Sequence, residues 1–162
     1  MYGRTLTALS YAAKPCPLRP GDVLELPFIL ALVPAGFPSP AEDYLEESLD
    51  IGAYLVKRKK TTFFMRVDGD SMEGAGINDG DLLVIDRAER CGDGSIVMAR
   101  IGDSFTVKRL RIIDGQAWLY PENEAYQPTP ITEGDDFEVW GRVTHSITSH
   151  GKPGTAGVEK VR

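Results

Sequence analysis

Short runs of β-branched, aromatic and other apolar residues recur along the chain from Thr61 onward, and polar turns separate them. The six runs cover residues 63–67, 82–85, 95–99, 105–108, 118–120 and 139–143. Asp-Gly or Gly-Asp pairs lie between them at positions 68/69, 79/80, 92/93, 102/103, 114/115 and 134/135. Such pairs favour the tight turns that reverse a strand. The pattern predicts a mainly β fold, either a curled sheet or a small open β-barrel.

The first 34 residues differ, because they contain five prolines and no sustained period of apolar positions. This composition predicts an extended N-terminal arm. Its apolar stretch, residues 28–33, is expected to lie as a strand or strip on another surface, so that the arm is docked. At the other end, the glycines and the proline of residues 149–162 predict a flexible tail.

A short helix is predicted to begin at Ser39, ahead of the β-rich part. Ser39 and Glu42 have the spacing of a capping box, and Pro40 suits the first helical position. The apolar stripe of this helix would consist of Tyr44, Leu45 and Leu49. A second helical turn is expected after Asp50, ending in the polar run 57–60.

Length, composition and charge indicate the number of domains, the kind of partner and the cellular compartment. The 162 residues are 42% hydrophobic and 26% charged, which predicts one globular domain with its own core. The 18 basic and 24 acidic residues give a net charge of −6, which argues against direct DNA binding through bulk positive charge. No run is apolar and long enough to span a membrane, and no signal sequence starts the chain. We therefore expect a cytoplasmic protein.

No metal or cofactor is expected. Cys16 and Cys91 are too few for a disulfide framework and are expected to be reduced thiols. Four aspartates near the first turn lack the spacing of a twelve-residue calcium loop, and we expect them to form turns: Asp68, Asp70, Asp79 and Asp81.

Ser71 is the first candidate for chemistry. It follows an apolar run in the segment Asp68-Gly69-Asp70-Ser71-Met72, whose Gly and Asp residues favour a tight turn that exposes the serine. A serine becomes a nucleophile when a base removes its proton. Of the two histidines, His145 lies in a late strand and His150 at the edge of the tail. Lysine is the other possible base.

Lys108 is the only lysine inside a predicted strand. At a reference pKa of about 10.4, only about one lysine in 2,500 is neutral at pH 7, so a working base needs a strongly lowered pKa. Desolvation by apolar neighbours shifts the pKa in that direction. The backbone N–H groups of Ser71 and Met72 would bind the oxyanion. On these residues alone, an ordinary turn serine and an outward-pointing lysine remain the more common interpretation.

The motifs of the chain together resemble those of the LexA-type self-cleaving serine peptidases. Those of the wider family are residues 69–72, 76–86 and 105–110, and those of its UmuD-like branch are residues 35–41, 119–126 and 139–145. Ser71 and Lys108 lie 37 positions apart, as in the family. One departure is Ala35, which stands where a cysteine is common in the UmuD-like branch.

The resemblance implies that Ser71 is the nucleophile, that Lys108 is the general base, and that the chain's own bond between Ala35 and Gly36 is the substrate. Residues 1–35 would be an arm removed by self-cleavage, residues 36–148 the peptidase domain and residues 149–162 the tail. The family cleaves faster on a RecA filament on single-stranded DNA. The resemblance also implies a homodimer that joins a UmuC-type Y-family polymerase for error-prone translesion synthesis in the SOS response.

Two alternatives remain open at this stage. A LexA-type or phage repressor shares the catalytic body, but it needs a DNA-binding domain of about 60 residues ahead of the cleaved bond. Only 35 residues precede Gly36. A non-catalytic β-rich binding module would keep the fold without using Ser71 and Lys108. A signal peptidase also pairs a serine with a lysine, but it works at a membrane, and this sequence predicts no membrane anchor, so it is not kept as an alternative.

Overall fold

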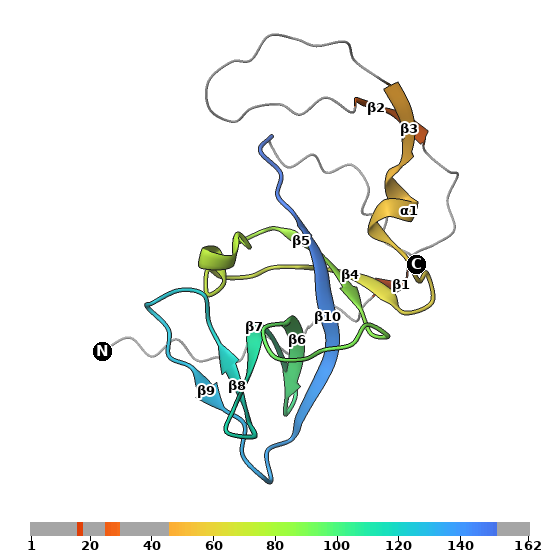
Figure 1. Cartoon of the computed structure of the whole chain (residues 1–162). Coiled ribbons are helices and arrows are strands. Elements are labelled where there is room, and N and C mark those ends of the chain that lie inside the picture. The colour runs from red at the N-terminus through yellow and green to blue at the C-terminus, as the bar shows by residue number, and fades with distance from the viewer. Residues whose placement is uncertain (1–15, 18–24, 30–45, 152–162) are drawn as a thin grey trace.

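The computed structural model describes residues 16–17, 25–29 and 46–151 (Figure 1). Its elements are β1 (Cys16–Pro17), β2 (Glu25–Ile29), β3 (Glu46–Asp50), α1 (Ile51–Leu55), β4 (Thr62–Arg66), the 3-10 turn η1 (Glu73–Ala75), β5 (Leu82–Asp86), β6 (Ile96–Ile101), β7 (Ser104–Ile113), β8 (Gln116–Tyr120), β9 (Thr129–Pro130) and β10 (Phe137–Ile147). All six predicted strands are present, as β4 to β8 and β10, so the mainly β prediction is confirmed.

The main sheet is antiparallel, with strand order β1-β4-β5-β10-β6-β7-β8-β9. The edges β1 and β9 do not pair with one another in the described part of the chain, so the sheet is curled and not closed. At the turn between β7 and β8, Asp114 (φ 50°) and Gly115 (φ 81°) are both left-handed. This conformation matches the two-residue turn that best fits the twist of a hairpin.

Strand β10 lies in the middle of the sheet and bends there. It pairs with β6 along its first half and with β5 along its second half, and its register shifts near Gly141 and again before His145. Such bulges increase the local twist of a strand. A Cβ added at Gly141 would lie 2.7 Å from Ile85 Cγ2, so glycine is required for this close approach to β5.

Two groups of buried side chains form the core. One group consists of Met72, Ile77, Leu83, Ile85 and Met98. The other consists of Val97, Ala99, Leu110 and Leu119. Because neighbouring positions on β6, residues 97–99, supply both groups, they lie on opposite faces of that strand.

The predicted helix over residues 39–49 is wrong for its last part. Residues 46–50 form strand β3, which pairs with β2 and sets Leu49 opposite Leu26. Pairing with a distant segment overrides the local helix signal here. The start of the predicted helix, at Ser39, lies outside the described residues. The second helical turn is confirmed as α1, where the Asp50 carboxylate accepts a hydrogen bond from the Ala53 N–H (3.0 Å).

Two segments of the N-terminal arm are paired with the rest of the chain. β1 pairs with β4, and β2 pairs with β3. The prediction of a docked arm is therefore confirmed for these segments, whereas residues 30–33 of its apolar stretch lie outside the described residues. Within the described ranges, no helix is long and apolar enough to cross a membrane.

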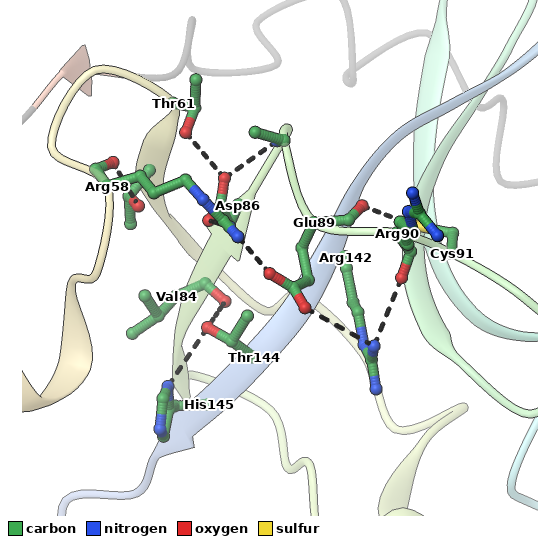
Figure 2. Close-up of polar contacts among 12 residues, drawn as sticks. Arg58, Thr61, Val84, Asp86, Glu89, Arg90, Cys91, Arg142, Thr144 and His145 are labelled. Atoms are coloured by element: carbon green, nitrogen blue, oxygen red, sulfur yellow. Dashed lines mark hydrogen bonds and ion pairs between the residues drawn. The ribbon is translucent and has the colours of Figure 1, made fainter.

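A cluster of ion pairs ties the connection between α1 and β4 to β5 (Figure 2). Arg58 Nη1 donates to Asp86 Oδ2 (2.5 Å) and to Glu89 Oε2 (2.7 Å). Thr61 Oγ1 donates to the other oxygen of Asp86 (2.7 Å). The run 57–60 is exposed, as expected of a solvated helix end, and Arg58 within it is bound by carboxylates.

Candidate active site

The segment after β4 reverses direction and carries Ser71 at its corner. Gly69 has a left-handed φ of 106°, and its N–H donates to Asp79 Oδ1 (2.8 Å). The Asn78 N–H donates to Asp81 Oδ2 (2.8 Å). The prediction that these aspartates form turns is thus confirmed for Asp79 and Asp81. Ser71 itself is half-buried.

The side chain of Met72, the residue after Ser71, packs into the core. It is 2% exposed and belongs to the core group of Ile77 and Met98. With that side chain buried, the backbone of Ser71 and Met72 is held at the surface of the core. Neither of their two N–H groups donates to an acceptor in the described part of the chain.

Lys108 lies in the middle of β7 and its side chain reaches the same corner. Its Nζ is 2.7 Å from Ser71 Oγ, 3.1 Å from Thr106 Oγ1 and 2.9 Å from the carbonyl oxygen of Val107. Burial lowers the pKa of Lys108 from its ordinary value. No carboxylate forms an ion pair with this lysine within the described ranges.

The fold brings together two of the predicted site residues, Ser71 and Lys108, and keeps the other candidate base apart. His145 packs against the ring of Tyr54, with ring centroids 5.8 Å apart, and its Nδ1 is 3.1 Å from Thr144 Oγ1 (Figure 2). Cys91 is a free thiol, and burial raises its pKa, which opposes thiolate formation. The predicted substrate bond, between Ala35 and Gly36, lies outside the described residues.

Residues 121–126, which we call the clasp loop, hold the serine corner and were not identified as site residues from the sequence. The Glu122 N–H donates to the Ser71 carbonyl (2.8 Å), and the Gly74 N–H donates to the Glu122 carbonyl (2.7 Å). Asn123 Nδ2 donates to the carbonyl oxygen of Asp70 (3.1 Å). The only sequence signal for this loop was its place in the motif 119–126.

Comparison with known proteins identifies the family of the chain. The model of the peptidase S24-like family matches residues 27–144. Protein MucA of Salmonella typhimurium is 43% identical over 129 residues, which cover 79% of this chain and 88% of MucA. Protein SamA of Salmonella typhimurium is 46% identical over 121 residues, covering 75% of this chain and 84% of SamA.

Protein ImpA, also of Salmonella typhimurium, is 49% identical over 113 residues, covering 70% of this chain and 77% of ImpA. These relatives are UmuD-like, so the resemblance found in the sequence motifs is confirmed. The chain therefore belongs to the peptidase S24 family, as a UmuD-like self-cleaving serine peptidase of the SOS response.

Proposed function

We propose that this chain cuts its own peptide bond between Ala35 and Gly36, with Ser71 as nucleophile and Lys108 as general base. The observation that carries the proposal is the 2.7 Å separation of Lys108 Nζ and Ser71 Oγ. This distance lies within the range over which a base takes a proton directly from a nucleophile.

The surroundings of Lys108 suit a neutral amine. A neutral amine has two N–H donors and one lone pair. The oxygens of Thr106 and Val107 accept those two donors, so the lone pair is left for the Ser71 hydroxyl. Burial acts in the same direction, because it lowers the pKa of Lys108 and raises the neutral fraction.

These contacts support a reaction in two stages, acylation of Ser71 and hydrolysis of the ester. Ser71 Oγ attacks the carbonyl carbon of Ala35 while its proton passes to Lys108 Nζ. The N–H groups of Ser71 and Met72, free of acceptors in the described chain, stabilise the oxyanion. The C–N bond then breaks, the proton moves from Lys108 to the amine of Gly36, and Ala35 is left as an ester on Ser71. Water hydrolyses this ester with Lys108 again as base.

The proposed substrate suits a narrow cleft. Ala35 and Gly36 are small, and Gly36 has no Cβ to obstruct the attacking oxygen. Because the bond belongs to the same chain, or to a second copy in a dimer, its effective concentration is high. A peptidase with a low rate constant can therefore still cleave this bond.

We further propose the division into an arm of residues 1–35, a peptidase domain of residues 36–148 and a tail of residues 149–162. The arm carries three basic and two acidic residues, so the 127 residues that remain after cleavage have a net charge of −7. This acidity favours action through protein partners. The partners proposed from the family are a second copy, a UmuC-type polymerase and a RecA filament that stimulates cleavage.

The test is incubation of the purified chain at about pH 10, where a lysine base becomes neutral without help, followed by mass spectrometry. We expect products of 35 and 127 residues, and no products from Ser71→Ala or Lys108→Ala. Matched controls are Ser104→Ala and Lys57→Ala, both at exposed positions, which should cleave like the wild type. Intact wild-type chain, or cleavage that survives in Ser71→Ala, would refute the proposal.

A further inference from the structure

Ser71 and Lys108 come from parts of the sheet that are far apart in strand order. Ser71 follows β4, Lys108 lies on β7, and β5, β10 and β6 are between them. In a flat sheet, four strand spacings of about 4.8 Å would separate the two strands by about 19 Å. The observed 2.7 Å contact between Lys108 Nζ and Ser71 Oγ therefore depends on the curl of the sheet. It also depends on the contacts that maintain this curl across the open side of the sheet.

The clasp loop makes that connection. It leaves the end of β8, the neighbour of β7, and reaches the turn in front of η1 (Figure 1). Its backbone at Glu122 forms two hydrogen bonds there, one with Ser71 in the turn and one with Gly74 in η1. Asn123 and Tyr126 bind the carbonyl oxygen and the carboxylate of Asp70, respectively. Both ends of the serine corner are thus attached to one loop.

The clasp loop packs so closely against Gly74 that there is no room for a side chain at that position. A Cβ added at Gly74 would lie 2.5 Å from the carbonyl oxygen of Glu122, a distance that real Cβ atoms do not adopt. Small movements of the loop would therefore be transmitted to the corner that holds Ser71.

An ion pair fixes the clasp loop to the strand that carries the base. Arg109 follows Lys108 in β7, and its Nε donates to Glu122 Oε1. Arg109 Nη1 also donates to the carbonyl oxygen of Gly94 (2.8 Å), which holds the guanidinium in place. The side chains of Arg109 and Glu122 are 27% and 28% exposed, so the pair is partly shielded from solvent.

We propose that Arg109 and Glu122 are positioning residues, whose ion pair holds the clasp loop so that Ser71 Oγ stays within hydrogen-bond reach of Lys108 Nζ. This inference rests on the proposed Ser71 and Lys108 chemistry. Neither residue contacts the reacting atoms. Their effect is on the distance and direction of the serine, to which a proton transfer is very sensitive.

The experiment measures the first-order rate of self-cleavage against pH for the full chain and its variants. We expect Glu122→Met to lower the maximal rate by about tenfold to a hundredfold. Glu122→Gln should lower the maximal rate less, because its amide keeps an oxygen that accepts a hydrogen bond from Arg109. The double variant Arg109→Met/Glu122→Met should be no slower than the slower of its two single variants, because both act through one contact.

The matched control is Arg111→Met on the same strand. It removes another ion pair, between Arg111 and Asp93, that has no link to the Ser71 turn. This control should cleave within twofold of the wild type. The double variant also keeps the net charge, so its pH midpoint should stay within about half a pH unit of the wild type. A positioning role lowers the maximal rate and leaves that midpoint unchanged.

Two results would overturn the inference. One is a Glu122→Met rate equal to that of Arg111→Met. The other is a midpoint of the double variant that rises toward the value of free lysine, because that would mean general loosening and solvation of Lys108. Failure of the proposed function would look different, since the wild type would stay intact or Ser71→Ala would be cut.

Discussion

At the scale of single residues, Thr106 decides how the Lys108 amine is oriented. Its Oγ1 lies 3.1 Å from Nζ, two positions before the lysine on the same face of β7. Thr106→Val keeps the branched shape and removes this acceptor. We expect the cleavage rate to fall about tenfold, equivalent to about 1.4 kcal/mol of activation free energy, because the amine loses a fixed orientation.

The measurement is a time course of self-cleavage at fixed pH, with thermal unfolding of a Ser71→Ala background as a check of folding. Ser104→Ala, exposed at the start of β7, is the control and should leave the rate unchanged. An unchanged rate in Thr106→Val would mean that the Val107 carbonyl alone orients the amine.

A second prediction concerns stability, because burial lowers the pKa of Lys108 in the folded state. Between that lowered pKa and about 10.4, the unfolded chain binds more protons than the folded one. The contribution of Lys108 to stability therefore rises with pH through this window, and below it the cost of the buried charge is constant. In a Ser71→Ala background, Lys108→Met should be more stable than its parent near neutral pH.

This advantage should shrink as the pH approaches about 10.4, because that is the reference pKa of lysine in the unfolded chain. Thermal unfolding midpoints measured in steps from pH 6 to pH 10.5 check the trend. Lys57→Met, at an exposed position, is the control for the loss of one lysine and is measured over the same pH series. An advantage that grows with pH would contradict the assigned direction of the pKa shift.

At the scale of elements, the Ser71 turn, the 3-10 turn η1 that follows it and the clasp loop behave as one unit. Gly74 is the contact point, since an added Cβ would meet the Glu122 carbonyl oxygen at 2.5 Å. We expect Gly74→Ala to lower the free energy of unfolding by about 1–3 kcal/mol through this overlap. Cleavage should also slow at least tenfold, because the turn that carries Ser71 must move.

Chemical denaturation and the cleavage time course measure the two effects. Gly92→Ala is the control, because a Cβ there meets nothing within 4 Å and its backbone is not left-handed. It should change the unfolding free energy by less than about 0.5 kcal/mol. If Gly74→Ala and Gly92→Ala gave the same unfolding free energy and the same cleavage rate, the contact between the turn and the clasp loop would contribute to neither.

Elements could be predicted from the sequence where the signal is local and repeated. Strands β4 to β8 and β10 have an apolar run and an Asp-Gly or Gly-Asp turn beside them, and both signals act within a few residues. Leu49 shows the limit of such reasoning. The capping box at Ser39 favours a helix, but the partner of Leu49 in β3 is Leu26, and no local pattern reports a partner so far away.

At the scale of the whole molecule, the proposed cleavage would detach a strand from its partner. β2 lies within the arm of residues 1–35, whereas β3 lies beyond the bond. An isolated two-stranded sheet is marginally stable, and here one covalent connection keeps its strands together. After cleavage, pairing would become intermolecular and would weaken.

Hydrogen exchange tests this consequence. We expect the amides of residues 46–50 to exchange at least tenfold faster in the cleaved protein than in uncut Ser71→Ala, because they lose the partners supplied by β2. The amides of β5 and β6, which pair within the central sheet, should be unchanged. Equal exchange of residues 46–50 in both forms would mean that the arm stays bound after cleavage.

The sequence by itself determined strands β4 to β8 and β10 and the turns between them, because apolar runs and turn-forming pairs are local signals. Its resemblance to the LexA-type peptidases singled out the two residues proposed for the chemistry, Ser71 and Lys108. Only the tertiary structure decided that β3 replaces a helix, that Thr106 and Val107 hold the lysine, and that Arg109 and Glu122 fix the clasp loop on Ser71. The physical reason is that each of these features is a contact between particular side chains or segments in the folded chain, and that the approach of Ser71 to Lys108 also depends on the curl of the sheet. Curl sums small twists over many strands, and it brings together residues that no short-range pattern connects.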